Sequence, residues 1–233
     1  MSRSAARRKA RRGYMIGCVL FAVFVLYTVL VAVAGVGTTP VKVVGENGAV
    51  TPGEEIRVGF ASLNVPASDA IGYSGTWYTV SKYLGYVCIL AAGALCLWAV
   101  WQAISRRGIA KMDRNLSCFC LLMIAMVLFY FLFELLRLNW RPVMLKGELE
   151  ASYPSTHTLL ALCGAGGAAL FLSRLSLTRA LKTAGILCLG FAAFLTVLCR
   201  LLSGVHWVTD ILGGILLSAA LLQFYMTLLR DKN

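Results

Sequence analysis

The chain has 233 residues, of which 59% are hydrophobic and 14% charged; soluble domains usually carry about 45–50% apolar and about 25% charged residues, so an ordinary soluble domain is excluded. The net charge of +12 would favour nucleic acid as a partner of a soluble protein. Here the basic residues cluster at the ends of apolar runs, where they mark membrane topology and contact anionic lipids, so we expect a membrane protein and no nucleic-acid partner.

The first apolar run extends from Met15 to Gly35 and follows a head of six Lys and Arg residues. A signal peptide has the same order, and Ala32, Val33 and Ala34 resemble a cleavage site. At about 20 residues, however, the run exceeds a signal-peptide core and is long enough to cross a bilayer. We therefore expect an uncleaved first membrane helix.

Residues 37–80 are polar and contain several Gly and Pro residues, which predicts an external loop. Within this loop, Val41–Val44 and Ile56–Phe60 have the composition of short strands and predict a hairpin. The aromatic and polar segment Gly75–Leu84 is typical of a membrane interface and leads into the next span.

Further apolar runs lie at about 84–104, 116–138, 157–173, 183–199 and 207–229. Together with the first run they predict an all-α, polytopic membrane protein, a bundle of about six transmembrane helices. We expect two parts. Residues 1–83 hold the basic segment, the first transmembrane helix and the external loop, and residues 84–229 form a transmembrane core.

The distribution of charge predicts the orientation in the membrane. Fifteen of the 22 Lys and Arg residues lie before the first run, after the second and fourth runs, or after the last run. The positive-inside rule then places both termini in the cytoplasm. The 37–80 loop, the 139–156 connection and the turn near 200–206 consequently face the extracytoplasmic side of the cell membrane.

The eight cysteines all lie in or at the edge of apolar runs, and none forms a CxxC pair. The two histidines are not spaced to join them at a zinc site. We interpret the cysteines as packing residues. We expect no metal and no cofactor.

Polar residues gather at the predicted outer ends of the last four helices, although polar groups inside spans are costly. His206 and Asp210 are spaced i and i+4, so they share one face of a helix. An acidic partner fixes the tautomer of an imidazole and makes it a competent nucleophile. Arg141 and Arg200 carry planar, permanently charged groups suited to phosphate oxygens.

Pro154, Ser155 and Thr156 precede a helix, whose free amides attract an anion. His157 then remains as the candidate general acid that donates a proton to the leaving oxygen. A single histidine at a helix end is more often a packing residue, and a single arginine near an interface is usually an anchor. Their convergence at one membrane face indicates a functional site.

These residues resemble the type 2 phosphatidic acid phosphatase superfamily, whose three blocks are K-x6-R-P, P-S-G-H and S-R-x5-H-x3-D. The resemblance covers about residues 84–229, and its third block is the specific one. The matching segments of this chain are Arg141–Pro142, Pro154–His157 and Cys199–Asp210.

The resemblance implies a six-helix core and metal-independent hydrolysis of a phosphate ester. It implies a phosphohistidine on His206, positioned by Asp210, and protonation of the leaving alcohol by His157. The residues implied to hold the phosphoryl oxygens are Arg141, Arg200, Ser155 and Thr156.

Three positions depart from the family pattern: Glu134 replaces Lys, Thr156 replaces Gly, and Cys199 replaces Ser. The change at position 134 removes a phosphate-binding cation, and Lys146 in the external connection is a candidate replacement. Substrate affinity and the preferred head group are therefore open.

Glu134, Arg137 and Arg141 are spaced to share one helical stripe, which leaves two interpretations of Glu134. In one, Glu134 forms a salt bridge with Arg141 or Arg200 and orients it, with an effect on specificity. In the other, it pairs with Arg137 and only offsets the cost of a charge near the membrane.

The sequence therefore predicts a membrane phosphatase that hydrolyses a lipid phosphate or diphosphate, with undecaprenyl diphosphate, phosphatidylglycerophosphate and phosphatidate as candidate substrates. Its expected partners are that lipid and the bilayer. One alternative is a phosphotransferase with the same intermediate. The other is a non-catalytic membrane protein that binds or transports an anionic lipid, which Glu134 in place of Lys would favour.

Overall fold

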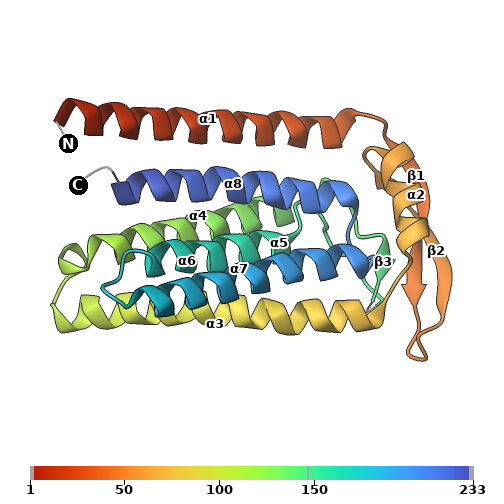
Figure 1. Cartoon of the computed structure of the whole chain (residues 1–233). Coiled ribbons are helices and arrows are strands. Elements are labelled where there is room, and N and C mark those ends of the chain that lie inside the picture. Colours follow the sequence, from red (N-terminus) through yellow and green to blue (C-terminus); the bar gives the residue numbers. More distant parts are fainter. Residues whose placement is uncertain (1–2, 146, 231–233) are drawn as a thin grey trace.

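The computed structural model describes residues 3–145 and 147–230, and it is a helical bundle with a small sheet at one end (Figure 1). Five of its helices are long and apolar enough to cross a membrane. These are α1 (Arg3–Val33), α3 (Gly75–Ser105), α4 (Arg114–Leu136), α7 (Arg179–Leu202) and α8 (Val208–Arg230). The predicted all-α, multi-pass membrane architecture is confirmed.

The sixth expected span is a shorter, interrupted helix. It consists of α5 (Thr156–Leu160), a π-helical turn at Ala161–Ala165 and α6 (Gly166–Leu172). At about 1.5 Å per residue it is about 26 Å long, less than the hydrocarbon thickness of about 30 Å. It contacts α3, α4, α7 and α8. This helix is shorter than the hydrocarbon layer and packs among the other helices. Six full spans are therefore not established.

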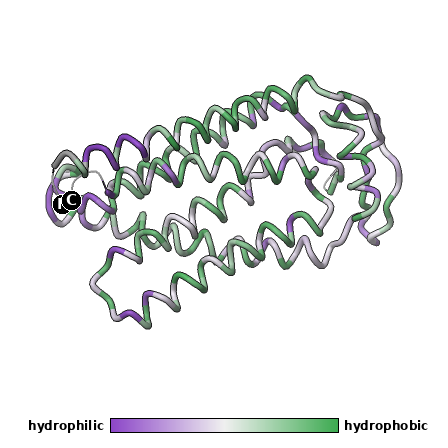
Figure 2. Tube along the Cα trace, turned by 45° about the horizontal axis from the view of Figure 1, so that its top comes forward, coloured by the Kyte–Doolittle hydropathy of each residue, from purple (hydrophilic) through white to green (hydrophobic). Residues whose placement is uncertain are grey.

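The surface of the bundle matches a lipid environment. Figure 2 shows hydrophobic residues along the length of the helices and hydrophilic residues concentrated toward the two ends. Large apolar side chains such as Leu90, Leu97 and Leu135 are more than 70% exposed. An exposed apolar surface of this extent is typical of helices that face lipid.

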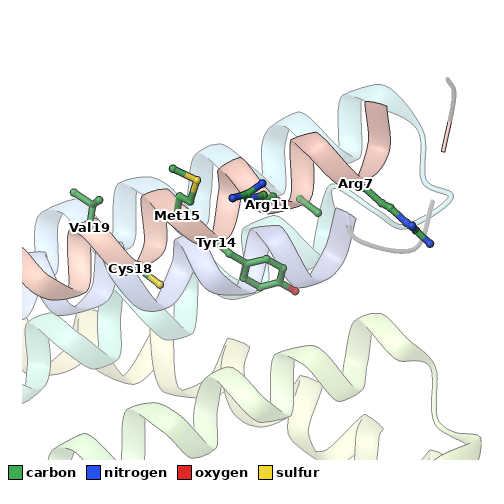
Figure 3. A pocket seen from close by; sticks show the side chains of 7 residues that line it. Arg7, Arg11, Tyr14, Met15, Cys18 and Val19 are labelled. Atoms are coloured by element: carbon green, nitrogen blue, oxygen red, sulfur yellow. The ribbon is translucent and has the colours of Figure 1, made fainter. Parts of the chain in front are cut away.

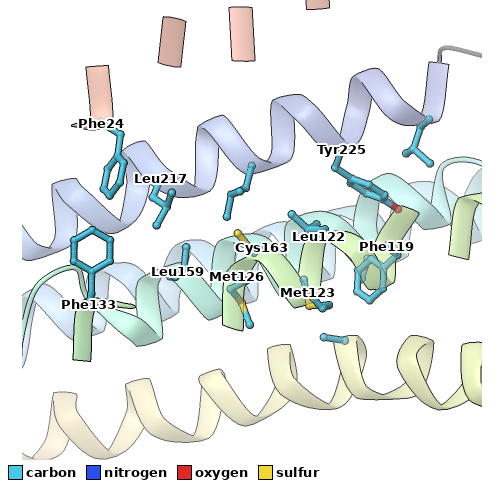
Figure 4. Close-up of a cluster of buried hydrophobic side chains, with 14 of the residues drawn as sticks. Phe24, Phe119, Leu122, Met123, Met126, Phe133, Leu159, Cys163, Leu217 and Tyr225 are labelled. Carbon is cyan, nitrogen blue, oxygen red and sulfur yellow. The ribbon is translucent and has the colours of Figure 1, made fainter. Parts of the chain in front are cut away.

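The interior of the bundle is a continuous apolar core (Figure 4). Phe24 of α1 and Phe133 of α4 meet edge to face with ring centroids 5.8 Å apart. Small residues let helices approach closely elsewhere: a Cβ atom at Gly164 would lie 3.4 Å from both Ala92 Cβ and the carbonyl oxygen of Cys88 on α3. Close packing of this kind is how membrane helices associate.

The predicted external loop is more structured than expected. The hairpin is confirmed, with β1 (Gly37–Val44) antiparallel to β2 (Val50–Val58). It is followed by the helix α2 (Ala61–Ile71), which we did not predict. A short strand β3 (Val143–Met144) pairs in parallel with β1.

The segment expected at the membrane interface forms the first turns of α3, which begins at Gly75. At the other end of this helix, a short 3-10 turn (η1, Ile109–Lys111) leads into α4.

The hairpin and α2 cover the end of the bundle opposite to the one where α1 begins and α8 ends (Figure 1). Val41, Ile56 and Val58 of the hairpin form a buried cluster with Trp207, which immediately precedes α8. The N-terminal part of the chain thus packs directly onto the turn that carries His206.

Candidate active site

The turn that holds His206 lies between α7 and α8 and is fixed by its neighbours. Gly204 has a φ of 68°, and a Cβ atom there would lie 1.9 Å from the carbonyl oxygen of Gly72. Only glycine fits this position, because both the backbone conformation and the close approach exclude a side chain. The amide of Ser74 also donates to the carbonyl of Ser203 at 3.1 Å.

His206 precedes the first residue of α8, so it does not share a helix with Asp210 as we expected. The two side chains nevertheless face each other, with Nδ1 of His206 3.6 Å from Oδ2 of Asp210. This separation is longer than a hydrogen bond, and such contacts often tighten when substrate binds. Nε2 is the ring nitrogen left for a substrate.

Asp210 is fully buried and its carboxylate is held by two further donors. The amide of Trp207 donates to Oδ2 at 2.9 Å, and Nδ2 of Asn139 lies 3.5 Å from Oδ1. These contacts hold the carboxylate against the Nδ1 side of the His206 ring.

The environment of His206 favours the neutral imidazole. Burial is the main cause that lowers its pKa well below the ordinary value, and the positive charges of Arg141 and Arg200 and the ring of His157 add to it. Burial penalises the charged form, and like charges do the same. A neutral ring keeps a free lone pair, as a nucleophile requires.

The Pro-Ser-Thr-His segment lies against the start of α8. The amide of Ser155 donates to the carbonyl of Asp210 at 3.0 Å, and Oγ of Ser155 accepts from the hydroxyl of Thr158 at 3.0 Å. A Cβ atom at Gly214 would lie 3.1 Å from the carbonyl oxygen of Ser155. The glycine pair Gly213–Gly214 therefore allows the two predicted motifs to come into contact.

Arg200 and Arg141 reach the same region from different elements. Arg200, in the last turn of α7, is 1% exposed, and its Cζ lies 5.0 Å from the centroid of the Tyr78 ring on α3. Arg141 lies beyond the end of α4, and its Nη1 is 2.8 Å from Oε2 of Glu150. The predicted helical stripe is wrong, because α4 ends where Arg137 adopts a left-handed backbone with φ of 46°.

Several nitrogen atoms of these side chains are buried without a hydrogen-bond partner in the described part of the chain. They are Nδ1 and Nε2 of His206, Nδ1 of His157, Nε and Nη1 of Arg200, and Nε of Arg141. Native proteins pair nearly all buried polar groups. Unpaired donors from all three predicted motifs, gathered at one site, are what a pocket for a multiply charged anion requires.

Glu134 makes neither of the salt bridges that we considered. No ion pair joins it to another described residue, since Arg141 pairs with Glu150 and Arg137 lies over the ring of Trp140. Glu134 instead lines a narrow crevice together with Thr156. Two of the departures from the family pattern therefore lie side by side.

Lys146 lies outside the described residues. Among those that are described, no group of three or more His, Cys, Asp or Glu residues is arranged to bind a metal. The third departure, Cys199, is buried next to Arg200 in α7.

Two buried asparagines complete the site and were missed by sequence analysis. Asn139 accepts a hydrogen bond from the amide of Gly59 at 3.1 Å and approaches Asp210 on its other side. Asn64 of α2 donates to the carbonyl of Gly59 at 2.7 Å and to Oγ1 of Thr209 at 2.8 Å. Their partners are far apart in the chain, so no local pattern could have identified them.

A large hollow elsewhere on the molecule is separate from this chemistry. It is an open, apolar depression along α1, lined by residues that include Arg7, Arg11 and Met15 (Figure 3). It lies near the start of α1, at the end of the bundle away from the β1–β2 hairpin.

Comparisons with known proteins agree with these motifs. The model of the PAP2 superfamily matches residues 133–233, which include all three blocks. No curated protein matches the chain.

Among solved structures, the fold is similar to that of a transmembrane PAP2-type phosphatidylglycerolphosphate phosphatase from Bacillus subtilis. The TM-score is 0.58 and the identity 20%, over 91% of this chain and 93% of that one. At this identity the likeness bears on the fold alone. The chain therefore resembles the PAP2 superfamily over its C-terminal region, residues 133–233.

Proposed function

We propose that this chain is a membrane phosphatase that hydrolyses a lipid phosphate or diphosphate through a phosphohistidine on His206. The observation that carries the proposal is the set of buried, unpaired nitrogens contributed by His206, His157, Arg141 and Arg200. Four such side chains from separate elements are costly to bury without a ligand. A phosphoryl group would pair with all four.

In the first step, Nε2 of His206 attacks phosphorus in line with the leaving oxygen. The bond between phosphorus and that oxygen breaks, and His157 donates a proton to the oxygen. Arg141, Arg200 and the start of α5 at Ser155 and Thr156 hold the other phosphoryl oxygens, where negative charge must be stabilised. Asp210 stabilises the positive charge that develops at Nδ1.

In the second step, a water molecule attacks the phosphohistidine from the side that the lipid has left. His157, now neutral, accepts a proton from this water. The bond between phosphorus and Nε2 breaks, which releases inorganic phosphate and restores the neutral ring of His206. Each turnover therefore consumes one water and leaves both histidines as they began.

The surroundings of the site support a lipid substrate presented on the extracytoplasmic side. Phosphatidylglycerophosphate, phosphatidate and undecaprenyl diphosphate are the candidates, and the site lies at the end of the bundle opposite to the start of α1. The basic residues at that start support a cytoplasmic position for the termini. We assign the chemistry to the core at 84–229, with Glu134 acting on head-group choice through the crevice that it shares with Thr156.

A screen of the three lipids with purified full-length protein tests this function. We expect phosphate release from at least one lipid in detergent with EDTA present, and a loss of more than about a thousandfold in His206→Gln. Adding Gln223→His to His206→Gln returns the number of histidines in the chain to two without restoring the site, so the double variant should remain inactive. Equal rates for the wild-type protein and His206→Gln would contradict the proposal.

A further inference from the structure

One stripe of α3 faces the candidate active site. Tyr78, Lys82 and Gly85 are spaced by four and then three residues, so they lie on the same face of this helix. At one end of the stripe, the ring of Tyr78 lies 5.0 Å from Cζ of Arg200. At the other end, a Cβ atom on Gly85 would lie 3.7 Å from Cδ2 of His157. Lys82 therefore lies about one helical turn from Tyr78 and from Gly85, and both of those residues contact the site.

The charges that act on the ring of His157 agree with this placement of Lys82. The positive charges that act on the ring of His157 are those of Arg200, Arg141 and Lys82. The side chain of Lys82 is exposed, and within the described part of the chain no carboxylate lies within ion-pairing distance of its ammonium group. Its four-carbon stem is therefore free to move toward an anion at the mouth of the site.

The site also needs a further cation. Arg141 is paired with Glu150 at 2.8 Å, so the charge of that guanidinium is partly offset before any ligand binds. Arg200 then remains as the main unpaired cation against a phosphate group that carries about two negative charges at neutral pH. Glu134 occupies the position where the family pattern has lysine and adds a negative charge nearby.

We propose that Lys82 of α3 is a third phosphate-binding cation of this site, supplying from another helix the positive charge that position 134 lacks. This inference rests on the proposed function, because a phosphate-binding cation contributes to catalysis only if the site hydrolyses a phosphate ester. Binding of inorganic phosphate tests it without requiring turnover.

The experiment measures the affinity of the purified full-length protein for inorganic phosphate, together with KM and kcat for a hydrolysed lipid. We expect Lys82→Gln to weaken phosphate binding about tenfold, which corresponds to about 1.4 kcal/mol, and to raise KM. Lys82→Arg should restore binding to within about threefold of the wild type, because it returns a cation to the same stripe.

Two controls separate a role in the site from a general charge effect. Arg137→Gln removes one exposed positive charge near the same end of the bundle and should leave phosphate affinity unchanged. In the second, Val80→Lys is added to Lys82→Gln; position 80 lies about half a turn round α3 and is 37% exposed. The ammonium then points away from the site, so affinity should stay low.

These measurements distinguish a failure of the Lys82 proposal from a failure of the phosphatase proposal. Wild-type affinity in Lys82→Gln, or recovery in the double variant, would overturn the role of Lys82 and leave the phosphatase proposal standing. Phosphate binding that depends on Lys82 in a protein that hydrolyses no lipid would support the cation and count against the phosphatase. A wild-type protein that does not bind phosphate would overturn the role of Lys82 as well.

Discussion

At the scale of single residues, the account depends on the protonation of His206. Its ring is buried beside Asp210, which faces Nδ1, and the positive charges of Arg141 and Arg200 also act on it. Burial and the two guanidinium groups prevail and hold its pKa well below the ordinary value of about 6.5. The ring then stays neutral as the pH falls from 7 through 6.5, and it gains a proton only in more acidic solution.

Nitrogen-15 NMR of histidine-labelled protein in detergent tests this protonation state. The chain has only two histidines, so His157→Gln leaves a single ring to observe. We expect the His206 ring to remain neutral at pH 5.5 in the substrate-free protein. Orthovanadate should raise its pKa, since a bound anion offsets the positive charges of Arg141 and Arg200. Titration near pH 6.5 without a ligand would contradict this view of the site.

At the scale of elements, the position of His206 depends on the contact between the turn at Ser203–His206 and the start of α3. Gly204 touches the backbone of Gly72, and Ser203 accepts a hydrogen bond from Ser74. The N-terminal region adds a second restraint, because Asn64 and Asn139 link Gly59 to Thr209 and Asp210. The polar segment 37–80 therefore supports the site rather than only connecting two spans.

Gly204→Ala tests the first of these restraints. The added Cβ atom would lie 1.9 Å from the Gly72 carbonyl oxygen, so the turn must move by more than 1 Å. A displacement of that size can reduce turnover about a hundredfold. Gly190→Ala on α7 is the matched control, since nothing lies within 4 Å of its Cβ position. Phosphate release should fall in the first variant and stay within about twofold in the second; equal activity would contradict the restraint.

At the scale of the whole molecule, much of the bundle follows from hydrophobicity. The apolar runs predicted the long helices, and α8 spans Val208–Arg230 where 207–229 was expected. Short strands in the 37–80 segment were also predicted, because their β-branched residues alternate with polar ones. The three motifs indicated which residues to bring together, since their types and spacing carry chemical meaning.

Other features could not be predicted from the sequence. Helix α4 ends where Arg137 adopts a left-handed backbone, a conformation that sequence patterns predict for glycine or asparagine but not for arginine. The pairing of Arg141 with Glu150, rather than with Glu134, follows from the return of the chain after β3. Lys82 belongs to none of the three motifs, and only the packing of α3 brings it near the site.

Trapping the covalent intermediate tests the central claim most directly. Protein that turns over a lipid radioactively labelled in its phosphate is quenched with alkali and digested, because phosphohistidine survives alkali and is lost in acid. We predict alkali-stable, acid-labile label on the peptide that contains His206, and none on the corresponding peptide of His206→Gln. Turnover without label on this residue, or label that persists in His206→Gln, would contradict the account.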